Sequence, residues 1–205
     1  FMQPKIFRTG LLILTVAVFI WSGIRPQDYG TWFLEVVPAV VGAIVIALTR
    51  KRFPLSNFML GCIAVHAIIL MIGGHYTYAK EPFFNWLRDI GIFERNNYDK
   101  IGHFVQGLFP AIYAREILLR NNVVRHGGWL GFILVSIVGL ITALYEIIEW
   151  LVAVWLGERA TDFLGTQGYI YDTQSDMGLA LVGALAAVFL LRRIHDRSIA
   201  RSGVR

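Results

Sequence analysis

The sequence contains few charged residues and a single cysteine, and both features restrict what the protein can be. Only 16% of its 205 residues are charged and 56% are apolar, whereas about a quarter of the residues in a soluble domain carry charge. The apolar residues come in long blocks, as in polytopic membrane proteins. Cys62 stands alone, so no internal disulfide can form. No hydrophilic stretch is long enough to fold separately, which predicts one transmembrane domain over residues 1–205.

Several catalytic and binding signatures are also absent. The sequence has no Walker loop, no dinucleotide-binding glycine fingerprint, and neither an H-E-x-x-H nor a G-x-S-x-G motif, which excludes the enzyme classes that carry them. Other enzyme classes stay open. The net charge of +5 is not accompanied by interleaved aromatic and basic residues, so we expect membrane lipids as partners and no nucleic acid.

Apolar runs of spanning length predict an all-α membrane protein with a six-transmembrane-helix bundle. The first run follows Lys5 and Arg8 and ends near Arg25 without an A-x-A-like cleavage site. We therefore expect a retained helix there, the alternative being a cleaved signal peptide. The predicted spans cover about residues 9–24, 32–49, 55–73, 99–118, 129–155 and 175–191, and a basic tail follows over 192–205.

The distribution of Lys and Arg predicts the orientation. If the N-terminus is cytoplasmic, 13 of the 19 basic residues lie on the cytoplasmic side, and of the 14 acidic residues only Glu116 and Asp196 do. Five spans would break this asymmetry. Both termini are therefore predicted to be cytoplasmic. The basic residues left on the outer side are Arg25, Lys80, Arg88, Arg95, Lys100 and Arg159.

Two longer connections, 74–98 and 156–174, are predicted on the outer side. In the first, Pro82 suits the first turn of a helix, and Phe83, Leu87 and Ile90 would share one face of it. We expect a short interfacial helix in the headgroup region. It could form a lid over a site, or simply belong to an aromatic belt.

Ionisable residues stand at helical spacing inside or beside three of the predicted spans. Charged groups at bilayer depth are costly and persist mainly where a site needs them. The pairs are separated by three or four residues, so each lies on one helix face, and His75 ends the third span at a similar depth. All of these residues reach the outer leaflet. The pairs are Asp99 with His103, Glu146 with Glu149, and Asp172 with Asp176.

Imidazole combined with several carboxylates suits a divalent transition metal, Zn, Mn or Fe, better than Ca or Mg. Glu146 or Glu149 would act as a general base on a water activated by the ion. Two alternatives stay open: a hydrogen-bond and ion-pair network with Arg95, Lys100 or Arg159, or a path for protons or substrate. The predicted metal ligands are His75, Asp99, His103, Asp172 and Asp176.

Other polar residues suggest simpler roles. We expect His66 to be a core histidine bonded to a neighbouring helix. Glu35 could line a cavity or face the headgroups. Arg115 and Glu116 are expected to form an exposed pair at the cytoplasmic end of the fourth span, and His195 is expected to be solvated.

Four motifs together resemble the YjdF-like family of bacterial inner-membrane proteins, over essentially the whole chain. The resemblance implies a multi-spanning protein of the inner membrane and favours the site residues above, but it implies no substrate, reaction or cofactor. The motifs are His75-Tyr76-Thr77-Tyr78, Asn97-Tyr98-Asp99-x-x-Gly102-His103-Phe104, Glu146-x-x-Glu149-Trp150 and Asp172-Thr173-Gln174-x-Asp176-Met177.

Three functions follow as hypotheses. The first is a metal-dependent intramembrane hydrolase or related enzyme acting near the periplasmic leaflet, with a lipid-like substrate. The second is a small transporter coupled to cations or protons. The third is a noncatalytic scaffold whose polar cluster fixes helix packing. If there is one site, His103 should lie within about 8 Å of at least two of Glu146, Glu149 and Asp176, the range over which ionisable groups couple.

Overall fold

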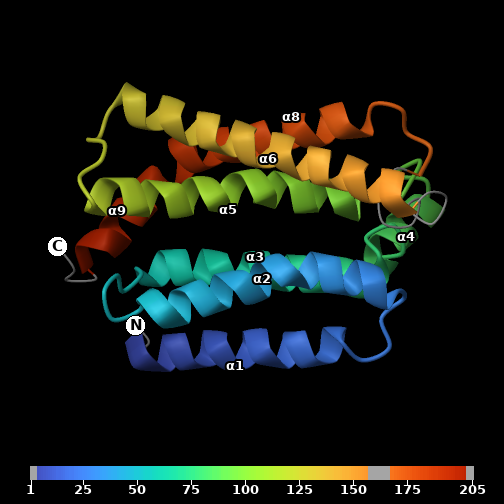
Figure 1. Ribbon diagram of the computed structural model, residues 1–205, viewed down its shortest axis with the longest axis horizontal. Helices are drawn as coiled ribbons and strands as arrows, with labels where there is room; N and C mark the ends of the chain where they lie inside the picture. Colours follow the sequence, from blue (N-terminus) through green and yellow to red (C-terminus); the bar gives the residue numbers. More distant parts are fainter. Residues whose placement is uncertain (1–3, 157–166, 202–205) are drawn as a thin grey trace.

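The computed structural model describes residues 4–156 and 167–201, and every regular element in these two segments is a helix (Figure 1). The prediction of an all-α protein is therefore confirmed for the described part, and helices occupy each of the six segments predicted as spans. The elements are α1 (Pro4–Ser22), α2 (Tyr29–Thr49), α3 (Asn57–Tyr76), α4 (Pro82–Asp89), α5 (Tyr98–Arg120), α6 (Gly128–Leu156), α8 (Asp172–Ala186), the π-helical turn η2 (Ala187–Leu191) and α9 (Arg192–Arg201).

Five helical segments of the described chain are long and apolar enough to cross a membrane: α1, α2, α3, α6 and the continuous helix from α8 through α9. Helix α5 is 23 residues long but is not among them. Charged residues near both of its ends lower its apolar character, and α3, α6 and α8 pack around it. The structure thus shows a bundle of spanning helices, and the count of six stays a prediction.

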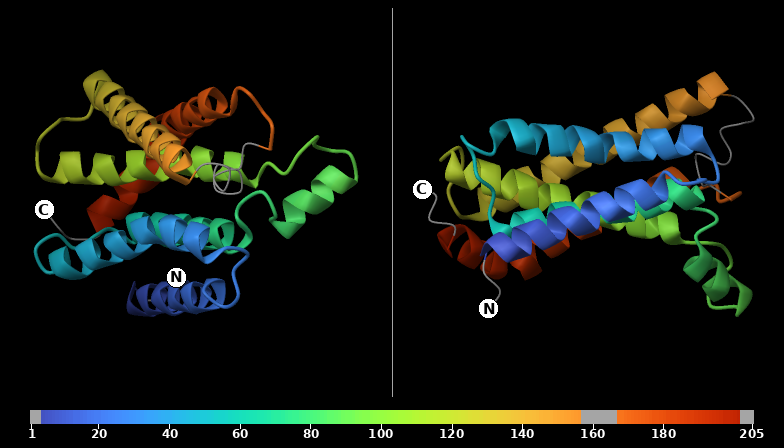
Figure 2. Two further views of the ribbon diagram at one scale, coloured as in Figure 1. Left: turned by 45° about the vertical axis from the view of Figure 1, so that its right-hand side comes forward. Right: turned by 90° about the horizontal axis from the view of Figure 1, so that it is seen from below.

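The helices form two layers (Figures 1 and 2). Helices α1, α2 and α3 make one layer, in which α3 packs against the other two, and α5, α6 and α8 make the second. Helix α3 joins the layers by packing on α5. Helix α4 projects from one end of the molecule, away from both layers (Figure 2). Because α3 and α5 join the two layers, a polar site at the end near α4 can include residues from both layers.

Helices α5 and α8 pack against each other more extensively than any other described pair of helices, and glycines on both let the backbones approach. A Cβ atom at Gly107 would overlap the carbonyl oxygen of Ala180, and one at Gly183 would overlap that of Phe104. Small residues at such an interface let two backbones approach in a membrane, where van der Waals contact drives helix association. This contact holds the first turns of α5 and α8 side by side, and both turns carry acidic residues.

The outward faces of the helices are apolar. Leu48 and Trp155 have 79% and 85% of their surface exposed, as expected for side chains that contact lipid rather than water.

The short helix expected in 74–98 is present as α4, with Glu81 accepting a hydrogen bond from the Phe84 N–H at 2.8 Å. Phe83 and Trp86 on α4 are exposed. Its place at the membrane interface stays a prediction.

A buried polar network closes the opposite end of the bundle, where α9 folds against α3. Glu116 accepts hydrogen bonds from the Ser56 N–H at 2.8 Å, the Ser56 hydroxyl at 2.6 Å and Arg120 at 3.0 Å, and lies 2.9 Å from His195 Nε2. Glu116 and His195 are 0% and 1% exposed. The expectation of an exposed Glu116 and a solvated His195 is therefore wrong, because the predicted tail is a helix that covers this end; Arg115 is buried too.

Candidate functional site

Lys100 organises one part of the acidic cluster. Its Nζ lies 2.7 Å from Asp172 Oδ1, 2.6 Å from Asp176 Oδ1 and 3.3 Å from Asp99 Oδ2. Arg95 reaches Asp172 Oδ1 at 2.9 Å and Asp99 Oδ2 at 3.6 Å. The first turns of α5 and α8 supply Asp99 and Asp172, and helix N-termini favour negative charge. These three carboxylates form a possible ligand group by distance, but the Lys100 ammonium already occupies the cation position among them.

His103 belongs to a second group. Its Nε2 lies 3.6 Å from Asp176 Oδ2 and its Nδ1 lies 3.9 Å from Glu146 Oε1, so α5, α6 and α8 each contribute one residue. Ligand atoms of the three residues lie within 4.8 Å of one another. The expected proximity of His103 to at least two of the cross-helix acids is confirmed by these distances. The chemical roles of the residues stay predictions.

The hydrogen bond of His103 bears on which ring nitrogen carries the proton and which has a free lone pair. Nδ1 lies 3.0 Å from Gln106 Oε1, and in the tautomer with its proton on Nδ1 the ring donates this hydrogen bond and leaves a lone pair on Nε2. Nε2 then points a lone pair toward a carboxylate oxygen 3.6 Å away, too far for a hydrogen bond. A tetrahedral metal ion with bonds of about 2.1 Å would hold two such atoms about 3.4 Å apart. The residues therefore fit a divalent cation placed between them.

The balance of charge in this cluster is negative. Four carboxylates, Asp99, Glu146, Asp172 and Asp176, are buried, and Arg95 and Lys100 are the cations that the described residues place against them. Both oxygens of Asp99 and Oε1 of Glu146 are buried without a hydrogen-bond partner. Buried carboxylates without full compensation need protons or a cation. Arg159, which the sequence offered as a further partner, lies outside the described residues.

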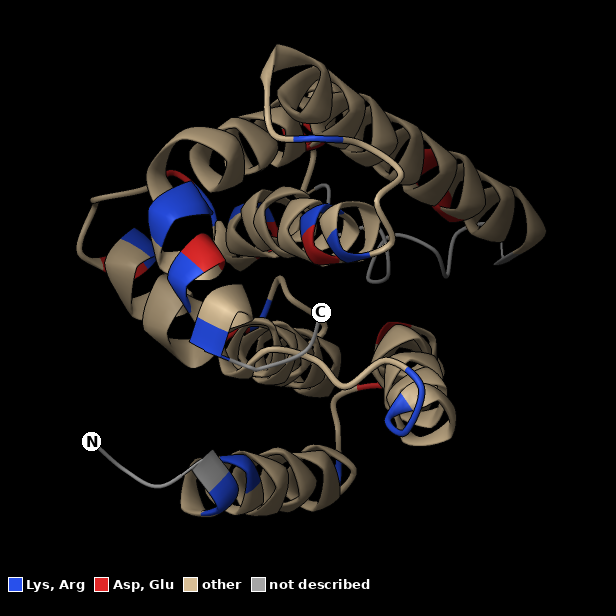
Figure 3. Ribbon diagram, turned by 90° about the vertical axis from the view of Figure 1, so that its left-hand side faces the viewer, with Lys and Arg blue, Asp and Glu red and all other residues tan. Residues whose placement is uncertain are grey.

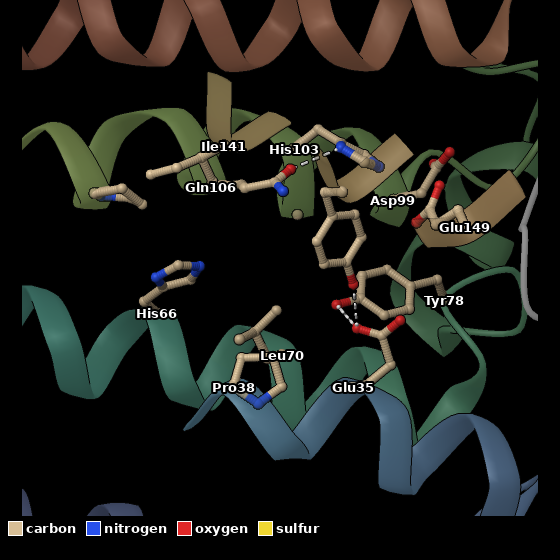
Figure 4. A pocket seen from close by; sticks show the side chains of 13 residues that line it. Glu35, Pro38, His66, Leu70, Tyr78, Asp99, His103, Gln106, Ile141 and Glu149 are labelled. Atoms are coloured by element: carbon tan, nitrogen blue, oxygen red, sulfur yellow. Dashed lines mark hydrogen bonds between the residues drawn. The ribbon is translucent and has the colours of Figure 1, made fainter. Parts of the chain in front are cut away.

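A cavity of about 190 Å³ adjoins the cluster, and residues of both layers line it (Figure 4). Figure 4 shows Asp99 and His103 on the α5 side of this space and Glu35 on the α2 side. Glu149 also lines the cavity. Of the two residues expected to act as a base, Glu149 therefore faces open space beside the cluster, whereas Glu146 lies among the groups that could hold a metal ion.

Tyr78 links the layers at this cavity. Its hydroxyl donates a hydrogen bond to Glu35 Oε2 at 3.0 Å, and Tyr145 on α6 reaches the same oxygen at 3.4 Å. The Tyr78 ring fits between Gly73 and Gly102, where any Cβ atom would clash with it. Burial raises the pKa of the Tyr78 phenol well above its ordinary value, so the hydroxyl stays protonated and remains a donor.

The backbone that carries Tyr78 is strained. Thr77 and Tyr78 follow the end of α3 with φ values of 51° and 50°, in the left-handed region that side chains other than glycine rarely adopt. Such strain persists where the surrounding contacts require it and often accompanies functional sites. Here it turns the chain sharply enough to place the Tyr78 ring between α3 and α5.

The sequence anticipated some of these positions and missed others. His75 joins neither group: its Nδ1 lies 2.9 Å from the Ser22 carbonyl oxygen and its ring lies against Trp21. Glu35 is buried in the cavity wall, which settles the choice between cavity and headgroups. Tyr78 was not singled out, although the doublet Gly73-Gly74 was a sign that a large group packs there.

Comparison with known proteins agrees with this architecture. The family model described as "Predicted membrane protein (DUF2238)" matches residues 7–197. The chain belongs to this family. It is also 46% identical to "Inner membrane protein YjdF" of Escherichia coli (strain K12) over 204 residues, which are 99% of this chain and 97% of that protein. No solved structure matches the chain.

Membership of the DUF2238 family and the apolar helices together make this a multi-pass protein of the inner membrane. The resemblance that the four motifs indicated is thereby confirmed. The family description names no reaction and no ligand. The function has to be inferred from the geometry of the site.

Proposed function

We propose that the protein binds one divalent transition metal ion, Zn, Mn or Fe, through His103, Glu146 and Asp176, and hydrolyses a lipid-like substrate near the periplasmic leaflet. The observation that carries the proposal is the convergence of these three side chains from three helices. The lone pair of His103 Nε2 faces Asp176, and Glu146 Oε1 is buried without a hydrogen-bond partner. One imidazole and two carboxylates are typical of Zn, Mn and Fe sites.

The other residues of the cluster have distinct parts in this proposal. When bound, the ion would polarise a carbonyl or phosphoryl oxygen as a Lewis acid. Glu149 lines the cavity and would accept a proton from the attacking water. Lys100 fixes Asp176 at 2.6 Å, and such outer contacts orient metal ligands. Gln106 holds the Nδ1 proton of His103.

Metal analysis of the purified protein tests the binding step. We expect close to one equivalent of a transition metal after purification without chelators, and less than about a tenth in His103→Ala and in Glu146→Gln, since loss of a ligand costs far more affinity than loss of an outer partner. His75→Ala is the matched control, because His75 lies apart from both groups. Less than a tenth of an equivalent in the wild type would refute the proposal.

A second function, transport coupled to protons or cations, is favoured by one observation. His66 Nδ1 lies 3.3 Å from the Tyr113 hydroxyl in the middle of the bundle, between the outer cluster and the buried network around Glu116. Saturable uptake of a divalent cation into proteoliposomes, abolished by Glu149→Gln, would favour transport over hydrolysis. Absence of flux together with bound metal would favour hydrolysis.

We also propose six spans with both termini in the cytoplasm, α5 being the span that its charged residues obscure. The support is that α1 begins and α9 ends at the same end of the bundle, where basic residues gather (Figure 3). Basic residues favour the cytoplasmic side. A reporter fused after Arg205 tests this: alkaline phosphatase activity there would contradict the topology, whereas fluorescence of a cytoplasmic reporter is expected.

A further inference from the structure

A second cavity lies next to the first, in the half of the bundle nearer the network around Glu116. It has a volume of about 500 Å³ and is bounded by α2, α3 and α5. Its wall is largely apolar and includes the small residues Ala39 and Gly42 on α2 and Ala67 on α3. It stays hollow because α2 packs mainly on α3 and does not fill the space in front of α5.

The two cavities adjoin each other. Pro38, His66 and Leu70 line both of them, and Figure 4 shows these three residues at the edge of the polar cavity. Together the cavities follow α2 from Glu35 to Thr49, a length of about 21 Å at 1.5 Å per residue. One leaflet of the hydrocarbon core is about 15 Å thick. The lined space is therefore long, polar at one end and apolar along the rest.

The membrane setting indicates what fills such a space. The protein lies in the inner membrane, where hydrocarbon chains rather than water surround its apolar surface. A chain gains little by moving from the bilayer to an equally apolar wall, so the tail alone cannot provide selectivity. Selectivity must come from the polar end.

The polar end disfavours an anionic head group. Neither cavity has a Lys or Arg among its described lining residues, whereas Glu35, Asp99 and Glu149 line the polar one. A phosphate or carboxylate there would face Glu35 and Glu149, and no described lining residue supplies a Lys or Arg to pair with it. Hydroxyl and amine groups can instead donate hydrogen bonds to these carboxylates.

We infer that the two cavities form one binding slot for an amphiphile with a single hydrocarbon chain and a hydroxyl or amine head group. The tail lies along Gly42 and Ala39 of α2, and the head lies between Glu35 and Asp99. This goes beyond the proposed function by naming a class of ligand, and it rests on that function only in placing the head beside the metal site. His66 lines both cavities, and Tyr113, 3.3 Å from it, lines the apolar one.

The chain offers a substitution that blocks the slot without disturbing its packing. A Cβ atom at Gly42 would meet nothing within 4 Å, and Gly42 lines the apolar cavity. In Gly42→Leu the new side chain is therefore expected to occupy part of the slot. Gly10→Leu is the matched control, because Gly10 on α1 is equally open and lines neither cavity. Both changes replace a helical glycine by leucine, so any gain in helix propensity is shared.

Photo-crosslinking in phosphatidylcholine vesicles tests the inference. Hexadecylamine, hexadecanol and palmitic acid, each with a diazirine in the chain, are added to the full-length protein, and adducts are mapped by peptide mass spectrometry. We expect the amine and the alcohol to label the slot-lining parts of α2, α3 and α5. Labelling should fall by about fivefold or more in Gly42→Leu, since the leucine takes the space of the chain, and should be unchanged in Gly10→Leu.

Two results would overturn the inference. One is equal labelling of the slot in Gly42→Leu and Gly10→Leu, or labelling spread evenly over the outward faces of all helices. The other is labelling by palmitic acid that equals or exceeds that by the amine. The experiment is repeated on protein stripped of metal, because the slot needs no ion: retained slot labelling in a protein that binds no metal refutes the proposed function alone.

Discussion

The contact between α5 and α8 provides a sharp test of how the site is built. In Gly183→Ala the added methyl group would lie 2.8 Å from Leu108 N, where ordinary contact begins at 3.4 Å, and would overlap the carbonyl oxygen of Phe104. Both neighbours are backbone atoms, so no side chain can rotate away, and the helices must separate by at least the 0.6 Å difference between 3.4 and 2.8 Å. Overpacking of this kind costs about 1–3 kcal/mol.

The single cysteine supplies the assay. Cys62 is 8% exposed and belongs to the same core cluster as Ala180 and Ala184. Its reaction with a maleimide dye therefore requires the core to open. A loss of 1–3 kcal/mol increases the open population, and with it the labelling rate, by about 5- to 150-fold, since 1.4 kcal/mol is tenfold.

Gly178→Ala is the control on the same helix, because a Cβ atom at Gly178 meets nothing within 4 Å. It should label no faster than the wild type, because alanine has the higher helix propensity. The reasoning fails if Gly183→Ala and Gly178→Ala label at rates within twofold of each other. Gly183→Ala should also bind metal more weakly, since Asp176 is carried by the same helix.

Three further changes have defined outcomes. Lys100→Met should lower the free energy of unfolding by about 3 kcal/mol or more, because it leaves buried carboxylates unpaired; wild-type stability in a denaturant titration would show that the network matters little. Glu116→Ala should loosen α9 by leaving His195 and Ser56 unpaired, seen as faster trypsin cleavage within α9, and an unchanged cleavage pattern would argue against it. The N-terminus of α2 should depend on pH, because the Thr31 N–H donates to Asp28 and lowers the pKa of Asp28 below its ordinary 3.8. The stabilisation by the Asp28 cap is present above the unfolded pKa and is lost as the pH falls through the lower folded pKa. Asp28→Ala should therefore lower the free energy of unfolding by about 0.5–2 kcal/mol near neutral pH and leave it unchanged in strong acid. A loss of stability that is independent of pH in thermal melts would refute this.

The helices and the depth of the polar residues could be predicted because both follow from position along the chain. An apolar run of spanning length specifies a helix, and a spacing of three or four residues puts Glu146 and Glu149 on one face. Depth follows from the rise per residue, which placed His103 at a level similar to Glu146. The short connection between the fourth and fifth predicted spans also made those two helices neighbours.

Neighbours across long connections could not be predicted in the same way. The sixth predicted span follows a longer loop, and its place beside α5 depends on Gly107 and Gly183, whose role is visible only once both backbones are placed. Glu35 and Tyr78 meet because two left-handed residues turn the chain after α3. His195 was expected to be solvated because a basic tail resembles a free end, and its burial depends on contacts with α3 and α5 that no local pattern reports.

The π-helical turn at Ala187–Leu191 has a consequence for the long helix that contains it. Asp176 and His195 are 19 residues apart, which at about 100° per residue would place them about 100° apart around an ideal α-helix. A π turn takes up one extra residue, and the remaining 18 residues complete five whole turns. The extra residue in the π turn thus brings Asp176 and His195 to the same face of the continuous helix, so that both side chains face the interior of the bundle. An insertion or deletion of one residue between them would rotate one end out of the bundle while leaving the composition of the helix almost unchanged.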